Sequence, residues 1–284
     1  EVIYHQPSYV SYGPVVQMAH GIPVALETSA ADDFQLDLDR LEGLISDRTK
    51  LLVLNFPNNP TGAILDAGQV RRIADLAIRH DLLVLTDEIY GELTYDSGHV
   101  SLLSIPEMKE RTILLHGMSK AWAMTGFRLG YACAPAEIIG AMNKLHQYTM
   151  LCAPTLSQHA AVEAFKGAGK DVPMLRDIFL KNRNYMFATL KEIGLPCSPL
   201  QGAFYAFPSI AGLNMTSAEF ALTLLEEEKV AVVPGTAFGD CGEGHIRCSY
   251  ATSLEEIKTA MERIGRFVAR LQNSNRSPVM KLSV

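Results

Sequence analysis

Apolar and polar positions form segments of two kinds in the first half of the chain. Short apolar runs at residues 51–54, 82–86, 112–115 and 129–134 have the length of buried strands. Between the first two, residues 66–79 place Val70, Ile73 and Ala77 at helical spacing, and Asp66 with Gln69 resembles a capping box. This order predicts an α/β fold, with a mainly parallel sheet and helices on both of its faces.

The pattern changes near residue 155. We expect helices at residues 156–165, 174–193, 219–229 and 254–271, with Gly194 ending the second, and strands at 202–207, 230–233 and 245–249. We interpret residues 1–175 as a large domain and residues 176–272 as a smaller C-terminal α+β domain, joined through the long helix. Residues 273–284 carry no pattern, and we expect them to form a mobile tail.

Composition and charge narrow the classes of function. The 284 residues are 48% hydrophobic and 20% charged, with a net charge of -6 and no long basic run. Charge therefore gives no reason to expect nucleic acid or a membrane as a partner. The five cysteines are scattered without a C-x-x-C pair, and the eight histidines form no metal-ligand cluster. We expect reduced thiols in a cytoplasmic protein, and no metal site.

Five polar residues follow predicted strands in the loops that come after them. They are Asn59, Asp87, Tyr90, Lys120 and Arg128. In open α/β sheets, ligands bind at this edge. Each residue alone has an ordinary interpretation as a turn residue, a helix cap or a solvated charge. Together they supply an amine for an aldehyde cofactor, an arginine for its phosphate and a carboxylate for its ring, which points to pyridoxal-phosphate (PLP) chemistry.

These segments resemble motifs of the class I/II aminotransferases, which are fold-type I PLP enzymes. The N-P-T-G, D-E-x-Y and S-K-x-x-x-x-x-G-x-R elements stand here at residues 59–62, 87–90 and 119–128. Near the C-terminus, residues 234–239 and 246–251 also fit, the second as the strand that carries the arginine for the substrate carboxylate. The resemblance runs from residue 1 to about residue 271 and implies the aminotransferase fold.

The resemblance implies a role for each motif residue. Lys120 would form the Schiff base with PLP and move the substrate proton, and Asp87 would pair with the pyridine nitrogen. Tyr90 and Asn59 would bind the phenolic oxygen of the cofactor, with Asn59 also near the substrate.

Four further assignments also come from the resemblance. Arg128 would bind the cofactor phosphate and Arg247 the substrate carboxylate. Tyr9 matches the aromatic residue that stacks on the pyridine ring, although a core aromatic is its ordinary interpretation. Ser119 is the hydroxyl nearest to the phosphate, because Gly117 stands where the family often has a serine.

A second departure from the family concerns the front of the chain. Family members carry a considerable segment before the point that matches Glu1, including a loop and helix N-terminus that bind the phosphate. We therefore expect an N-terminally truncated member of the family, with its large domain incomplete. The resemblance also implies a homodimer.

Three functions stay open at this stage. The first is an amino-acid aminotransferase that passes an amino group to a 2-oxo acid by a ping-pong mechanism. The second is a carbon–sulfur β-lyase on the same scaffold, although such lyases tend to carry histidine where Tyr90 stands. The third is a non-catalytic domain or inactive fragment. The set of motifs favours transfer.

Overall fold

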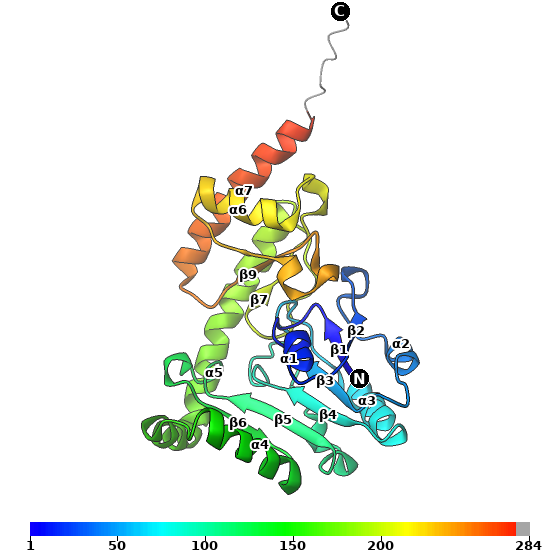
Figure 1. Ribbon diagram of the computed structural model, residues 1–284. Helices are drawn as coiled ribbons and strands as arrows, with labels where there is room; N and C mark the ends of the chain where they lie inside the picture. The colour runs from blue at the N-terminus through cyan, green and yellow to red at the C-terminus, as the bar shows by residue number, and fades with distance from the viewer. Residues whose placement is uncertain (277–284) are drawn as a thin grey trace, which may run out of the picture.

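A six-stranded sheet forms the larger part of the computed structural model, which describes residues 1–276 (Figure 1). Its strands are β1 (Val2–Gln6), β2 (Pro23–Glu27), β3 (Leu51–Asn55), β4 (Leu83–Asp87), β5 (Thr112–Gly117) and β6 (Gly130–Cys133). They lie in the order β2-β1-β3-β4-β5-β6, and the first five are parallel while β6 runs antiparallel to β5. The predicted α/β fold with a mainly parallel sheet is confirmed.

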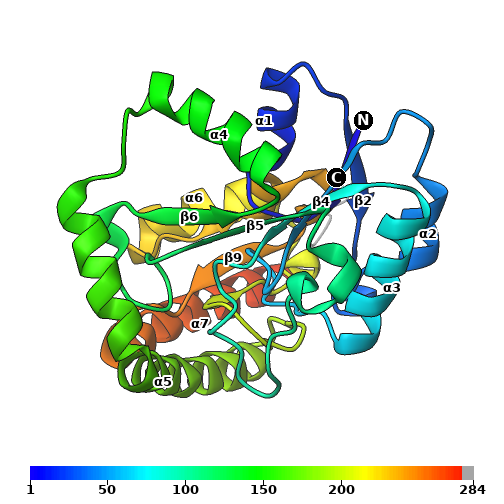
Figure 2. The ribbon, with the colours of Figure 1, turned by 90° about the horizontal axis from the view of Figure 1, so that it is seen from below.

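Helices cover this sheet from both sides. They are α1 (Tyr12–Met18), α2 (Leu38–Gly43), α3 (Ala67–Arg79), α4 (Ala136–Thr149) and α5 (Thr155–Glu192). Figure 2 shows α1 and α4 on one side of the sheet and α5 on the other. The predicted capping box of α3 is confirmed, because the Gln69 N–H donates to the Asp66 carboxylate at 2.8 Å and the Asp66 N–H donates to the Gln69 side chain at 3.0 Å.

Two predicted helices are one continuous helix. Helix α5 spans the region where Gly167, Gly169 and Pro173 break the helical pattern, so the prediction of separate helices at 156–165 and 174–193 was wrong. A proline removes one backbone hydrogen bond, and burial of Val172 and Phe179 on α5 offsets that loss. The helix ends as predicted before Gly194, which has φ +80°.

A smaller antiparallel sheet forms from the C-terminal part. It has the order β7-β9-β8, with β7 (Tyr205–Ala206), β8 (Val233–Pro234) and β9 (Ile246–Ser249), and it is joined by α6 (Ser217–Glu228) and α7 (Leu254–Arg276). The strand predicted at 202–207 is only Tyr205–Ala206, and the strand predicted at 230–233 begins only at Val233 and ends at Pro234. Short 3-10 helices occupy Ala30–Asp32, Leu102–Ser104, Pro106–Met108, Thr125–Phe127, Ala211–Leu213, Gly235–Phe238 and Asp240–Gly242.

Two apolar cores underlie these parts. One packs the large sheet against α2 and α3 and includes Ile3, Leu54 and Ile73. The other packs α5, α6 and α7 around the small sheet and includes Phe220 and Phe267. Because α5 runs through residue 175, the division at 175/176 stays a prediction.

The C-terminal end differs in part from its expectation. Residues 273–276 belong to α7 rather than to a patternless tail, and the rest of that prediction, residues 277–284, lies outside the described part of the chain. Of the helices described, none combines the length and apolar character that crossing a membrane requires.

Candidate active site

A cavity of about 450 Å³ lies at the carboxyl ends of the parallel strands. Its walls come from the loops after β1, β3, β4 and β5 and from β7 and β9 of the small sheet. Six of the predicted site residues line it: Tyr9, Asn59, Asp87, Tyr90, Lys120 and Arg247. The fold therefore brings together residues that are up to 238 positions apart in the sequence, as the lining by Tyr9 and Arg247 shows.

Arg128 and Ser119 do not line this cavity. The Arg128 side chain is exposed and its Nη1 donates to the carbonyl oxygen of Thr125 at 2.9 Å. Ser119 is half-buried, and its carbonyl oxygen accepts from the Thr125 hydroxyl at 2.8 Å. The phosphate contacts assigned to both residues stay predictions.

Lys120 is half-buried in the loop that follows β5. Its Nζ lies 5.5 Å from the centroid of the Tyr90 ring and 5.4 Å from that of Phe204. Burial lowers the pKa of Lys120, and the charges of Arg247 and Arg128 lower it further, while Asp87 opposes them. A lowered pKa gives a larger neutral fraction of the amine, and the neutral amine is the nucleophile and base.

Asp87 ends β4 and is fixed by two hydrogen bonds. The Tyr12 hydroxyl donates to Oδ2 at 2.8 Å, and the backbone N–H of Ile89 donates to Oδ1 at 3.1 Å. Burial raises the pKa of the Asp87 carboxyl, and both hydrogen bonds oppose that rise. The carboxylate therefore has a fixed orientation in the cavity.

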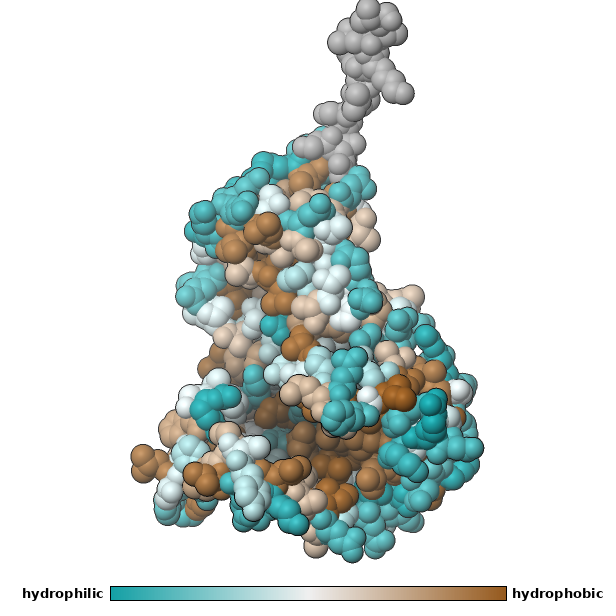
Figure 3. Space-filling model, viewed as in Figure 1, coloured by the Kyte–Doolittle hydropathy of each residue, from teal (hydrophilic) through white to brown (hydrophobic). Residues whose placement is uncertain are grey.

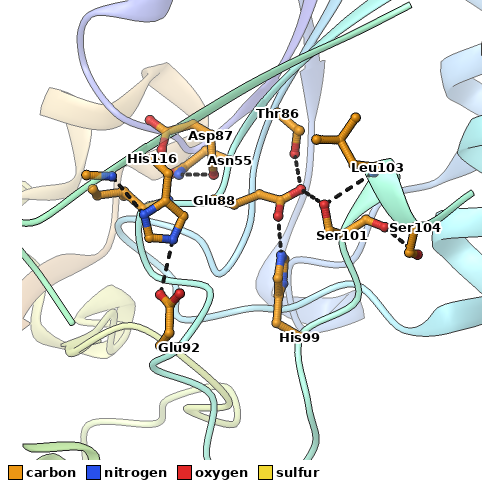
Figure 4. Close-up of polar contacts among 12 residues, drawn as sticks. Asn55, Thr86, Asp87, Glu88, Glu92, His99, Ser101, Leu103, Ser104 and His116 are labelled. Atoms are coloured by element: carbon orange, nitrogen blue, oxygen red, sulfur yellow. Dashed lines mark hydrogen bonds and ion pairs between the residues drawn. The ribbon is translucent and has the colours of Figure 1, made fainter. Parts of the chain in front are cut away.

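The side chain of Asn55, at the end of β3, holds the loop that follows this strand. Its side-chain nitrogen donates to the carbonyl oxygen of Asp87 at 3.0 Å, a contact drawn in Figure 4, and its side-chain oxygen accepts from the Asn59 N–H at 3.2 Å. The backbone N–H of Asn55 donates to Nε2 of buried His5 at 3.1 Å. Through these contacts, Asn55 fixes the position of the Asn59 backbone relative to Asp87.

Glu88 belongs to a separate polar cluster that does not line the cavity. Its carboxylate contacts Nε2 of His99 at 2.7 Å and accepts from the hydroxyls of Ser101 at 2.9 Å and Thr86 at 3.2 Å (Figure 4). These partners satisfy a buried carboxylate, so Glu88 supports the strand end beside Asp87.

Arg247, on β9, reaches the cavity from the small sheet. Its Nη1 donates to Oδ1 of Asn59 at 2.9 Å, and its guanidinium carbon lies 4.4 Å from the centroid of the Tyr205 ring and 4.9 Å from that of Phe238. Among the described residues, none accepts a hydrogen bond from its buried Nε. A buried cationic donor without a partner suits an anionic ligand.

Five cavity residues were not singled out from the sequence: Tyr12, Asn55, Ile89, Leu115 and His116. Tyr205, the sixth, belongs to residues 201–205, which we expected near the substrate without a specific role. Tyr12 lies in the same segment as Tyr9, and Asn55 and His116 are polar residues at the ends of apolar strands. Position at a strand end could have marked the last two. Contacts between distant segments, such as Tyr12 with Asp87, left no local signal.

The donor set fits PLP. It offers an amine for the aldehyde, a carboxylate for the ring nitrogen, and a phenol and an amide for the phenolic oxygen, from Lys120, Asp87, Tyr90 and Asn59. Arg247, with its unpartnered Nε, fits a substrate carboxylate. Within residues 1–276, no group of His, Cys, Asp or Glu is arranged to hold a metal ion.

Comparison with known proteins agrees with this chemistry. The family model for aminotransferase class I and II matches residues 1–264. A relative described as a putative aminotransferase, YugH of Bacillus subtilis, is 47% identical over 268 residues, which cover 94% of this chain and 69% of that protein. An aspartate aminotransferase of Pyrococcus abyssi is 43% identical over 267 residues, covering 93% of this chain and 69% of the relative.

A solved structure shows the same fold. The aromatic aminotransferase from Pyrococcus horikoshii superposes with a TM-score of 0.92 at 42% identity, covering 95% of this chain and 74% of that one.

Proposed function

The chain belongs to the class I and II aminotransferase family, whose members use PLP, and we propose that PLP binds in the cavity around Lys120. In this proposal the chain moves an amino group from an amino acid to a 2-oxo acid by a ping-pong mechanism. The observation that carries the proposal is the convergence of Lys120, Asp87, Tyr90, Asn59 and Arg247 on one cavity.

When bound, PLP supplies an electron sink for the bonds at the substrate Cα. Asp87 would hold the ring nitrogen, because its carboxylate is fixed by Tyr12 and Ile89 and faces the cavity. Tyr90 and Asn59 would bind the phenolic oxygen, Tyr9 would lie against the ring, and Arg128 with Ser119 would bind the phosphate.

Lys120 would carry the substrate proton as a general base at its Nζ. Its lowered pKa suits this role, because an amine that titrates closer to neutral pH can both accept and return a proton. The rings of Tyr90 and Phe204 limit where Nζ can lie.

Arg247 would bind the substrate carboxylate with its planar fork. Asn59 holds Nη1 at 2.9 Å, so the guanidinium is oriented before the substrate arrives. A fixed carboxylate sets the Cα of the substrate in one place relative to Lys120, which reduces the entropy lost in reaching the reactive geometry.

The side chain of the amino acid substrate is tested by a small panel. The relatives include aspartate and aromatic-amino-acid aminotransferases, so L-aspartate and L-phenylalanine are assayed first, with 2-oxoglutarate as acceptor. Formation of glutamate that requires PLP, the donor and the acceptor together supports the proposal. If protein that has bound PLP forms no glutamate with any amino acid of the panel, the proposal of amino-group transfer is wrong.

A second copy of this chain is the proposed partner. Six apolar side chains of α4, of the connection after it and of the start of α5 are exposed: Met142, Leu145, Tyr148, Met150, Leu151 and Leu156. Figure 3 shows apolar residues on the lower part of the molecule, where α4 lies. None of the α4 side chains is buried, and a patch of this kind suits a self-complementary interface.

Five free cysteines accord with the proposed cytoplasmic location.

A further inference from the structure

Tyr205 contacts two residues of the proposed site that come from different parts of the fold. It lies on β7, and its hydroxyl is 2.9 Å from the hydroxyl of Tyr90. The guanidinium of Arg247, on the neighbouring strand β9, lies 4.4 Å from the centroid of its ring. Tyr90 follows β4 of the large sheet, so one side chain links the cofactor side of the cavity to the substrate side.

We propose that Tyr205 is a positioning residue with two separable functions: its hydroxyl orients Tyr90 toward the cofactor, and its ring holds the guanidinium of Arg247 for the substrate carboxylate. This inference rests on the proposed function and adds a residue to it.

The hydroxyl function follows from burial and from the short distance between the two hydroxyls. Both phenols are buried, and each is the other's hydroxyl partner. Burial raises the pKa of both phenols, and the positive charge of Arg247 opposes that rise in both. Either hydroxyl can donate to the other, and in the arrangement that we propose the Tyr205 hydroxyl donates to Tyr90. Tyr90 then keeps its own proton for an acceptor in the cavity.

The ring function follows from the contacts of Arg247. Its guanidinium is fixed at one nitrogen by Asn59 and lies against the rings of Tyr205 and Phe238. Aromatic faces attract a guanidinium and restrict its plane. The ring of Tyr205 is needed for this contact, whereas its hydroxyl is not.

Several titratable groups face the two phenols. Asp87 and Lys120 face Tyr90 from the large sheet, Arg247 faces both phenols from β9, and Tyr9 faces Tyr205 from the loop after β1. The experiment therefore compares variants of one residue, so that these groups stay constant.

Tyr205→Phe tests the hydroxyl. The measurement is the pH midpoint of the absorbance change of PLP bound to the chain. A hydrogen bond to the phenolic oxygen of PLP withdraws charge and lowers the proton affinity of the nitrogen that joins Lys120 to PLP. Weakening this hydrogen bond should therefore raise the midpoint, by about half a pH unit. In a Tyr90→Phe background, Tyr205→Phe should cause no further shift. Tyr185→Phe, outside the cavity, is the matched control and should leave the midpoint unchanged.

Tyr205→Leu tests the ring. L-aspartate and L-phenylalanine are titrated through the absorbance of the bound PLP. Because both amino acids share the α-carboxylate, we expect the apparent Kd of each to rise about three- to tenfold in Tyr205→Leu. Tyr205→Phe keeps the ring and should keep both Kd values. If Tyr205→Leu lowers the melting temperature strongly, Tyr205→Met provides a second variant without a ring.

The outcomes separate the inference from the function on which it rests. An unchanged midpoint in Tyr205→Phe overturns the hydroxyl function, and equal Kd values in the Phe and Leu variants overturn the ring function. If the unaltered chain gives neither a PLP absorbance nor a response to amino acids, the proposed function itself is wrong.

Discussion

The hydroxyl of Tyr12 donates a hydrogen bond to Oδ2 of Asp87 at 2.8 Å, which joins the start of α1 to the end of β4. Burial raises the pKa of Asp87, and this bond opposes the rise. Tyr12 therefore stabilises the ionised carboxylate, the form that the proposed contact with a protonated ring nitrogen requires.

Tyr12→Phe should restrict PLP binding at low pH. Loss of the bond raises the pKa of Asp87, so the carboxylate becomes neutral at a higher pH than before. A hydrogen bond to a charged group contributes about 1.5–3 kcal/mol, so the acidic limit of PLP affinity should move up by roughly one to two pH units. The Kd for PLP is measured from acidic to mildly alkaline pH, with Tyr185→Phe as control. An acidic limit that stays in place in Tyr12→Phe would show that Tyr12 does not act on Asp87.

Arg247→Lys should weaken amino acid binding and leave PLP binding intact. Lysine keeps the charge but loses the planar fork and the contact with the Tyr205 ring. We expect the apparent Kd for L-aspartate to rise about tenfold, which corresponds to about 1.4 kcal/mol. Arg72→Lys, on the surface of α3, is the matched control. Equal loss of PLP and amino acid affinity would place Arg247 in the cofactor site instead.

Leu145→Glu with Tyr148→Glu should disrupt the proposed dimer. Both side chains are largely exposed, at 69% and 88%, and burying two new carboxylates in an apolar interface is costly. Analytical ultracentrifugation should show a dimer for the unaltered chain and a monomer for the double variant. Leu222→Glu introduces a carboxylate at an exposed position of α6, outside the proposed interface, and should leave the dimer intact. A monomeric unaltered chain would contradict the proposal directly.

The free energy of unfolding should decrease as the pH is lowered, because His5 is held neutral in the folded chain. Burial lowers the pKa of His5 to about 3, against an ordinary value of 6.5. Below pH 6.5 the unfolded chain binds a proton that the folded chain does not. The free energy of unfolding should therefore decrease by roughly 1.4 kcal/mol per pH unit as the pH falls from 6.5 toward 3.

His5→Gln keeps an acceptor for the Asn55 N–H and removes the titration. Urea unfolding at pH 6.5 and one unit lower should show a smaller difference for this variant than for the unaltered chain. His20→Asn, at an exposed position after α1, should leave the difference unchanged. If His5→Gln retains the full difference, another group causes the pH dependence.

Local patterns predicted the elements that position the site. The apolar strands and the motif residues that follow them were visible because a parallel sheet places its strand ends along one edge. Asp87 and Lys120 could be found in this way. Tyr12 could not, because its bond to Asp87 spans 75 residues and depends on where α1 lies over the sheet.

Two helices show where local patterns mislead. Helix α4 buries none of its side chains, so its apolar residues do not form the core-facing stripe that marks a helix in sequence. Helix α5 carries two glycines and a proline near its middle, and packing on both sides of them overrides their local tendency to end a helix. Tertiary contacts decided the second case.

The central claim is that Lys120 is the residue that PLP joins. The chain is incubated with PLP, reduced with borohydride, digested and analysed by peptide mass spectrometry, beside Lys120→Ala. We expect the PLP-derived mass on the peptide that contains Lys120, and no comparable label in Lys120→Ala. Label spread over other lysines, or equal label in the two proteins, would contradict the claim.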